Sequence, residues 1–220
     1  PDDIATWLEA RRVTIAPIDR DDIVGVGHAL DALESVLARL REPRPGTVPP
    51  RGLLLTGPSG TGKTLCARWL AGSLGSVPAF DLPPDILTPR RVRAAFAHLA
   101  TQERSVVFLP EIDAVGRSRD WGGHDQPTRR ILFSLLEAMD GLTPIDAGRG
   151  PVVIATSNRS SLDAALVRPG RLGISIVFDL PDDRERVLLL ERFLRGRRTD
   201  GLDLRHLAGL TRGWSPAALR

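Results

Sequence analysis

Short apolar runs alternate along the chain with longer stretches in which apolar residues recur every three or four positions. Runs of four or five such residues, bounded by glycine, proline or charged residues, are typical of buried strands. The intervening stretches gather their apolar side chains on one helical face, which indicates helices packed against a sheet. Strand and helix in alternation predict a three-layer α/β sandwich with a mostly parallel sheet. The expected strands include 52–56, 106–109, 152–156 and 174–178.

The helical stretches also predict which residues face the core. An amphipathic helix is expected at 30–40, before a proline-rich connector. Three later helices present apolar faces that read as core packing. Their members are Leu65, Trp69 and Leu70 in the first, Val92, Ala95, Phe96 and Leu99 in the second, and Ile131, Leu132, Leu135, Leu136 and Met139 in the third.

The composition is that of a globular protein with a substantial core. The chain has 220 residues, of which 42% are hydrophobic. Its apolar stretches end too soon to cross a membrane, and no charged leader is evident, so we expect a cytoplasmic protein. A net charge of +3 does not imply a nucleic acid partner. Cys66 is the single cysteine, which excludes an internal disulfide, and a small buried residue is expected there rather than a reactive thiol.

One cation differs from all the others. Of 30 basic residues, Lys63 is the only lysine. Because this chain uses arginine wherever a generic positive charge suffices, position 63 is expected to need a slim ammonium. Residues 57–64 read GPSGTGKT and fit the pattern G-x-x-x-x-G-K-[ST] between a strand and a helix. This arrangement favours a phosphate-binding loop over an ordinary turn, and it predicts ATP or ADP with Mg²⁺ as ligands.

Four segments in a fixed order resemble a known family. They are DDIVG at 21–25, the phosphate loop, SVVFLPEIDAV at 105–115 and the stretch 151–181 that contains RPGR. Together they resemble the AAA ATPases in the narrow sense, which include unfoldases, proteasomal ATPases and membrane-anchored AAA proteases, over about residues 20–219. The resemblance implies a P-loop NTPase fold with a five-stranded sheet ordered 5-1-4-3-2. The implied divisions are an N-terminal linker or end of a preceding element at 1–20, a large α/β nucleotide-binding subdomain at 21–181 and a partial helical lid at 182–220.

The resemblance also assigns roles to individual residues. Glu111 would polarise the attacking water and Asn158 would position it. Arg168 and Arg171 would reach a neighbouring subunit's nucleotide, unless they form surface salt bridges. Thr64 would bind the metal. The expected nucleotide contacts are Asp22, Ile23, Val24 and Gly25 at adenine, and Pro58, Ser59, Gly60, Thr61, Gly62, Lys63, Thr64 and Leu65 at the phosphates.

Pro110 departs from the family pattern at a chemically important position. The family carries an Asp-Glu pair here, in which the Asp orients magnesium, whereas this chain has Pro110-Glu111. Using Asp113 instead would put Ala114 in the place of the base, so we keep Pro110 at the metal position. Proline is tolerated at a strand end. Losing such a metal partner costs about 10–100-fold, so we expect nucleotide binding with weaker magnesium dependence and slow or absent turnover.

Other departures affect substrate and nucleotide contacts. The aromatic pore-loop tripeptide of the family is absent after the second strand. Leu172 follows the RPGR segment, where the family commonly has phenylalanine, and Pro216 replaces a glycine that approaches the nucleotide in the family. Trp121 is expected in a loop, as a partner contact or a core residue.

The leading hypothesis is an ATP-binding module of a hexameric ring that remodels a protein substrate, alongside partner domains. The alternative is a catalytically silent scaffold whose nucleotide occupancy controls assembly. A kinase is a distant third reading, because it would leave Asn158 and the RPGR segment without a role.

Overall fold

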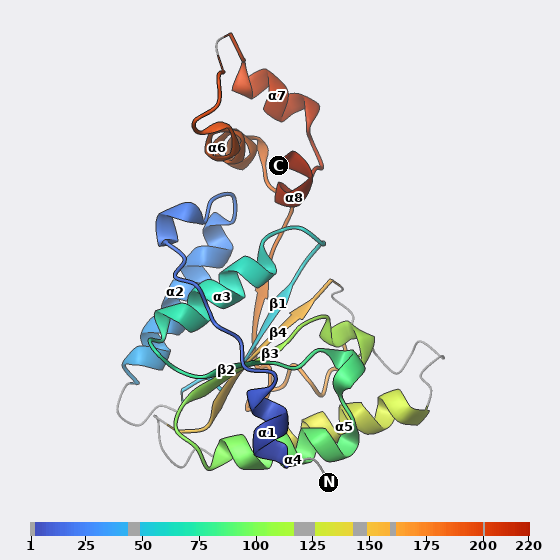
Figure 1. Cartoon of the computed structure of the whole chain (residues 1–220). Helices are drawn as coiled ribbons and strands as arrows, with labels where there is room; N and C mark the ends of the chain where they lie inside the picture. The colour runs from blue at the N-terminus through green and yellow to red at the C-terminus, as the bar shows by residue number, and fades with distance from the viewer. Residues whose placement is uncertain (1–2, 44–48, 117–125, 143–148, 159–161, 200) are drawn as a thin grey trace.

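The sheet of this protein has five strands, all parallel, in the order β2-β3-β4-β1-β5 (Figure 1). This confirms the predicted α/β fold and strand order. The computed structural model describes residues 3–43, 49–116, 126–142, 149–158, 162–199 and 201–220, so Trp121 lies outside the described residues. The strands are β1 (Gly52–Thr56), β2 (Ala79–Asp81), β3 (Ser105–Leu109), β4 (Pro151–Ser157) and β5 (Ile174–Val177).

Helices cover both faces of the sheet, and alternating strand residues feed the two cores. In β1, Leu53 and Leu55 face one core and Leu54 faces the other, as the period of two in a strand requires. The first core lies under α2 (Gly27–Arg41) and α3 (Lys63–Ser73). The second lies under α1 (Ile4–Glu9), α4 (Pro89–Ala100) and α5 (Gln126–Asp140).

The predicted helical faces are confirmed with one exception. All four apolar positions of α4 are buried, and α5 buries Leu132, Leu135, Leu136 and Met139 with Ile131 partly covered. In α3, Trp69 and Leu70 are buried, whereas Leu65 is 43% exposed. Leu65 differs because it lies in the first turn of α3, where it lines a cavity instead of the core.

Residues 3–19 pack against the α/β body. Trp7 and Leu8 of α1 are buried in the core against α4. The chain then runs along β2, where Val13 N–H donates to Ala79 O and Asp81 N–H donates to Arg11 O. The described part of the segment expected as a linker or the end of a preceding element thus packs along the edge of the sheet.

A small helical lid stands over the carboxyl ends of the strands (Figure 1). It consists of α6 (Asp183–Leu194), α7 (Leu204–Leu210) and α8 (Pro216–Leu219). Asp182 and Glu185 form a capping box at the start of α6. The buried guanidinium of Arg186 holds the lid together by donating to Ala208 O, Pro181 O and Asp183.

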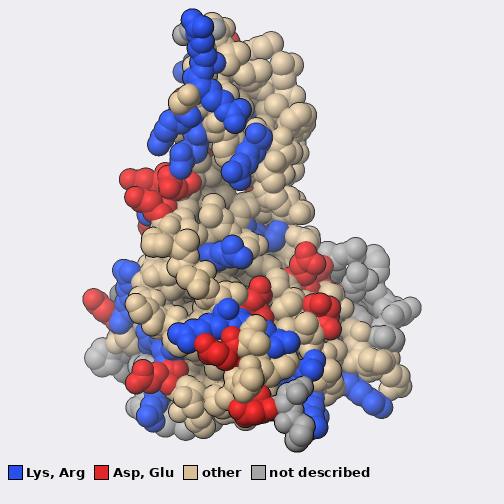
Figure 2. Space-filling view, in the orientation of Figure 1, with Lys and Arg blue, Asp and Glu red and all other residues tan. Residues whose placement is uncertain are grey.

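Charges of both signs are mixed over the face of the α/β body shown in Figure 2, whereas blue side chains concentrate on the lid. The formal net charge is only +3. On this face, the positive charge is therefore densest on the lid.

Candidate nucleotide site

The glycine-rich loop between β1 and α3 forms a tight cradle. Gly57, Gly60 and Gly62 have φ values of +143°, +78° and +97°, which side-chain-bearing residues rarely adopt. A Cβ at Gly57 would lie 2.0 Å from Phe178 O, and one at Gly60 would lie 2.7 Å from Ser215 Oγ. Thr61 Oγ1 donates to Pro58 O at 2.8 Å, which holds the loop closed on itself. The loop thus has the backbone shape that the sequence pattern predicts.

Lys63 points its ammonium back into this cradle. Its Nζ donates to Gly57 O and Pro58 O, both at 2.7 Å, and the residue is only 7% exposed. Desolvation lowers the pKa of Lys63, and the nearby charges of Asp113 and Glu111 oppose that shift. A buried ammonium held by neutral carbonyls is well placed to bind an anion that enters the cradle.

Two adjoining cavities lie between the α/β body and the lid. One of about 490 Å³ extends over the phosphate loop and is lined by Lys63, Thr64, Glu111 and Asn158 among others. The other, of about 520 Å³, is lined by Asp22, Ile23 and Val24. Five residues line both cavities and join them: Gly62, Leu65, Phe193, Pro216 and Arg220.

The expected adenine segment is tied to the lid. Asp22 Oδ1 accepts from Arg192 at 2.5 Å, and Gly27 N–H donates to Glu185 Oε1 at 3.3 Å. Gly25 has a φ of +76°, and a Cβ there would meet Leu189 at 2.7 Å. Asp22, Ile23 and Val24 therefore line the cavity, while Gly25 permits close packing of α6.

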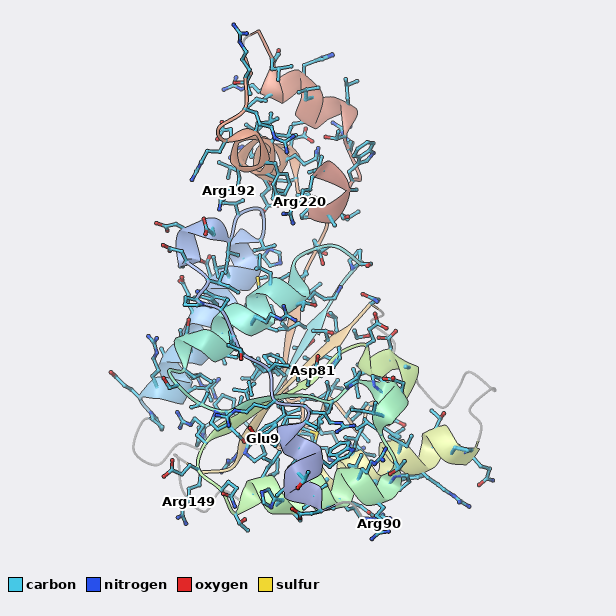
Figure 3. The ribbon with its side chains drawn as sticks, viewed as in Figure 1. Glu9, Asp81, Arg90, Arg149, Arg192 and Arg220 are labelled. Carbon is cyan, nitrogen blue, oxygen red and sulfur yellow. The ribbon has the colours of Figure 1, made fainter. Side chains whose placement is uncertain are left out.

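Lid residues contribute to the site in ways that sequence reasoning missed. Figure 3 shows Arg192 and Arg220 at the base of the lid, facing the α/β body. Arg220 and Phe193 line both cavities, and Ala217 N–H donates to Gly60 O at 3.1 Å. No local motif marks these side chains, because their place in the site depends on how the lid docks.

The end of β3 places Glu111 and Asn158 on the phosphate cavity. β3 ends at Leu109, so Pro110 follows the last strand residue, where its missing N–H is tolerated. Among the described residues, Glu111 is the only non-glycine with positive φ, at 49°. Its N–H donates to Thr156 Oγ1 at 3.2 Å, and Asn158 N–H donates to Asp113 Oδ1 at 3.3 Å. These bonds fix the two segments beside the loop.

The two candidate finger arginines have different surroundings. Arg171 makes a bidentate ion pair with Asp140, at 2.7 and 2.6 Å, and also donates to Ala165 O. The hydrogen bond to Asp140 raises the pKa of Arg171, and the same bond lowers the pKa of Asp140. Arg168 is exposed. Neither Arg168 nor Arg171 lines either of the two cavities between the α/β body and the lid.

Cys66 behaves as the small buried residue that the sequence predicts. It is 0% exposed on the inner side of α3, and burial raises the pKa of its thiol to about 12. We expect native protein to resist iodoacetamide at mildly alkaline pH, because its thiolate fraction falls about a thousandfold or more below that of a free thiol. Intact-mass spectrometry with and without urea measures this. Since Cys66 is the single cysteine, labelling in urea alone supports the buried site, and rapid labelling of native protein contradicts it.

In the described part of the chain, no three His, Cys, Asp or Glu side chains group as metal ligands would. The same residues include no helix with the length and apolarity needed to span a bilayer.

Comparison with known proteins identifies relatives of the α/β body. Residues 53–180 match the family described as "ATPase family associated with various cellular activities (AAA)". The chain is 37% identical over 215 residues to ATP-dependent zinc metalloprotease FtsH 2 of Petrotoga mobilis, covering 90% of this chain and 33% of that protein. It is 39% identical over 214 residues to FtsH of Acidimicrobium ferrooxidans, covering 90% of this chain and 32% of the relative. The chain thus spans about a third of the length of these relatives.

Proposed function

Because the chain belongs to the AAA family of ATPases, we propose that it is the ATP-binding module of a ring-forming machine that remodels proteins. The observation that carries this proposal is the buried Lys63 ammonium in its glycine cradle, at the wall of the phosphate cavity. In the proposed division, residues 21–181 form the nucleotide-binding subdomain and 182–220 form a partial lid. A cytoplasmic location is part of the same proposal.

The residues present fit a nucleoside triphosphate. A Cβ at Gly57 or Gly60 would collide with Phe178 or Ser215, so the backbone shape of the cradle requires glycine at both positions. Phosphate oxygens would replace the two carbonyl partners of Lys63, and charged acceptors make stronger hydrogen bonds than neutral ones. Mg²⁺, bound by the Thr64 hydroxyl and phosphate oxygens, would neutralise charge on the phosphates. The adenine ring would occupy the second cavity, against Ile23 and Val24.

Hydrolysis is proposed to be slow. Glu111 and Asn158 lie on the phosphate cavity, where the carboxylate would polarise a water and the amide would orient it. Pro110 lines the same cavity without a carboxylate. In this proposal, Glu111 and Asn158 would position the water, whereas position 110 offers the metal no carboxylate.

Assembly into a hexameric ring is proposed from the RPGR segment. The bidentate bond between Arg171 and Asp140 braces this segment within the chain. Exposed Arg168, three residues earlier, would then reach the nucleotide of a neighbouring copy, where a guanidinium stabilises charge on the transferred phosphoryl group. The remodelled substrate would be a protein.

Restoring a carboxylate at position 110 tests the hydrolysis proposal. We expect Pro110→Asp to raise ATP turnover about 10-fold, because it returns a partner to the metal. Steady-state phosphate release, measured at several protein concentrations to allow assembly, provides the readout. Adding Glu111→Gln to the same variant is the control, and it should abolish the gain. Equal, brisk turnover by the unchanged chain and Pro110→Asp would refute the proposal.

A silent scaffold is the second candidate, and Pro110 favours it because the phosphate cavity has no carboxylate at that position. In that case, Pro110→Asp would remain inactive while ATP still bound and shifted the oligomeric state. Sedimentation velocity with and without ATP distinguishes the two functions.

A further inference from the structure

Asp81 carries a buried carboxylate oxygen that has no partner. It is the last residue of β2, and its Oδ1 makes no hydrogen bond. Burial raises the pKa of Asp81, with Arg68 opposing the shift through its charge, and no ion pair joins Asp81 to Arg68 in the described part of the chain. An unsatisfied buried acceptor is costly, so its presence calls for a compensating ligand.

A small cavity lies in front of this oxygen. Its volume is about 50 Å³, and Asp81, Thr64, Pro110 and Thr156 contribute to its lining. The last three also line the phosphate cavity, so the two spaces share a wall. Figure 3 shows Asp81 near the carboxyl edge of the sheet, below α3. The space is large enough to hold a water molecule.

Strand register explains why Asp81 points toward the metal position. Asp81 pairs with Phe108 in the parallel ladder, two residues before Pro110 on the neighbouring strand. Phe108 and Ala79 both pack in the core under α3. Side chains alternate along a strand, so Asp81, two residues after Ala79, faces the same side of the sheet as Ala79. Position 110, two residues after Phe108, faces that side as well. The Asp81 carboxylate therefore lies beside position 110, where the family carries an Asp and this chain has proline.

We propose that Asp81 replaces the missing carboxylate of position 110 as a positioning residue for magnesium, acting through water in this cavity on the side of Thr64. The inference rests on the proposed nucleotide function. On this proposal, the magnesium dependence of nucleotide binding comes from Asp81 of β2 instead of a carboxylate after β3. Nothing in the family resemblance marks this residue.

The test compares nucleotide affinity with and without magnesium. A fluorescent ADP analogue is titrated into the chain and into Asp81→Asn, in excess Mg²⁺ and in EDTA. We expect the substitution to weaken binding about 10-fold in Mg²⁺ and to leave binding in EDTA unchanged. Asp85→Asn is the matched control, because Asp85 is an exposed carboxylate four residues away, and it should change neither affinity.

The double variant separates metal positioning from a structural role. With Pro110→Asp present, Asp81→Asn should have no further effect on magnesium-dependent binding, since the carboxylate has been restored on β3. Asp81→Glu should keep the magnesium dependence in the unchanged background. Asp81→Ser replaces Asp81→Asn if thermal melting shows that the latter does not fold.

Three results would overturn the inference. An equal loss in Mg²⁺ and EDTA, or the same loss in both backgrounds, would give Asp81 a structural role in place of metal positioning. Unchanged magnesium dependence in Asp81→Asn would remove it from the site. Failure of the unchanged chain to bind the analogue in either condition would instead refute the nucleotide function itself, so the two failures are distinguishable.

Discussion

Replacing Lys63 with alanine is expected to weaken ATP binding by about 100-fold or more. The ammonium would contact two phosphate groups, and hydrogen bonds to charged groups contribute about 1.5–3 kcal/mol each. No second lysine exists in the chain to take its place. Isothermal titration calorimetry of ATP measures the effect, with EDTA present so that the contribution of magnesium does not interfere.

Lys63→Arg is the informative companion. The cradle holds a slim ammonium between Gly57 O and Pro58 O, at 2.7 Å from each, and a planar guanidinium is too broad to make the same two contacts. We therefore expect Lys63→Arg to bind nearly as poorly as Lys63→Ala, although its charge is kept. ATP affinity that survives Lys63→Ala within a factor of about two would show that the cradle is not the phosphate site.

Gly57→Ala is expected to cause the largest loss of stability among single changes in the loop. The added Cβ would lie 2.0 Å from Phe178 O, and backbone on both sides must move to relieve the contact. We expect the free energy of unfolding to fall by about 3 kcal/mol or more, with ATP binding lost as well. Urea denaturation followed by tryptophan fluorescence measures the change.

Gly75→Ala is the matched control for backbone strain. Gly75 also has a left-handed backbone, with φ +92°, but a Cβ there would meet nothing within 4 Å. Its substitution should cost only about 1 kcal/mol, which isolates the strain of positive φ from the collision. Equal losses in the two variants would mean that contact with Phe178 does not constrain the loop.

The features predictable from sequence are those carried by local patterns. Strand runs such as 52–56, the buried face of α4 and the glycines around Lys63 all depend on spacing within a few residues. The position of Pro110 just beyond β3 belongs to the same class. Strand order required the resemblance to a family, because periodicity alone does not say which strands are neighbours.

The remaining features depend on contacts between distant parts of the chain. Trp7 is buried because α1 folds back onto α4, and Arg171 is fixed by Asp140, which lies 31 residues away in sequence. Arg220 reaches both cavities only because α8 docks on the phosphate loop. Asp81 reads as an ordinary polar strand end until the register places it beside position 110. Pairwise packing of this kind leaves no local signature.

The hydrogen bond from Ala217 N–H to Gly60 O connects the lid directly to the phosphate loop. The contact between Asp22 and Arg192 connects the lid to the α/β body at the far end of the cavities. If a ligand in the site breaks one of these contacts, a partner that breaks the same contact by binding the lid changes the affinity for the ligand, and the ligand changes the affinity for the partner by the same factor.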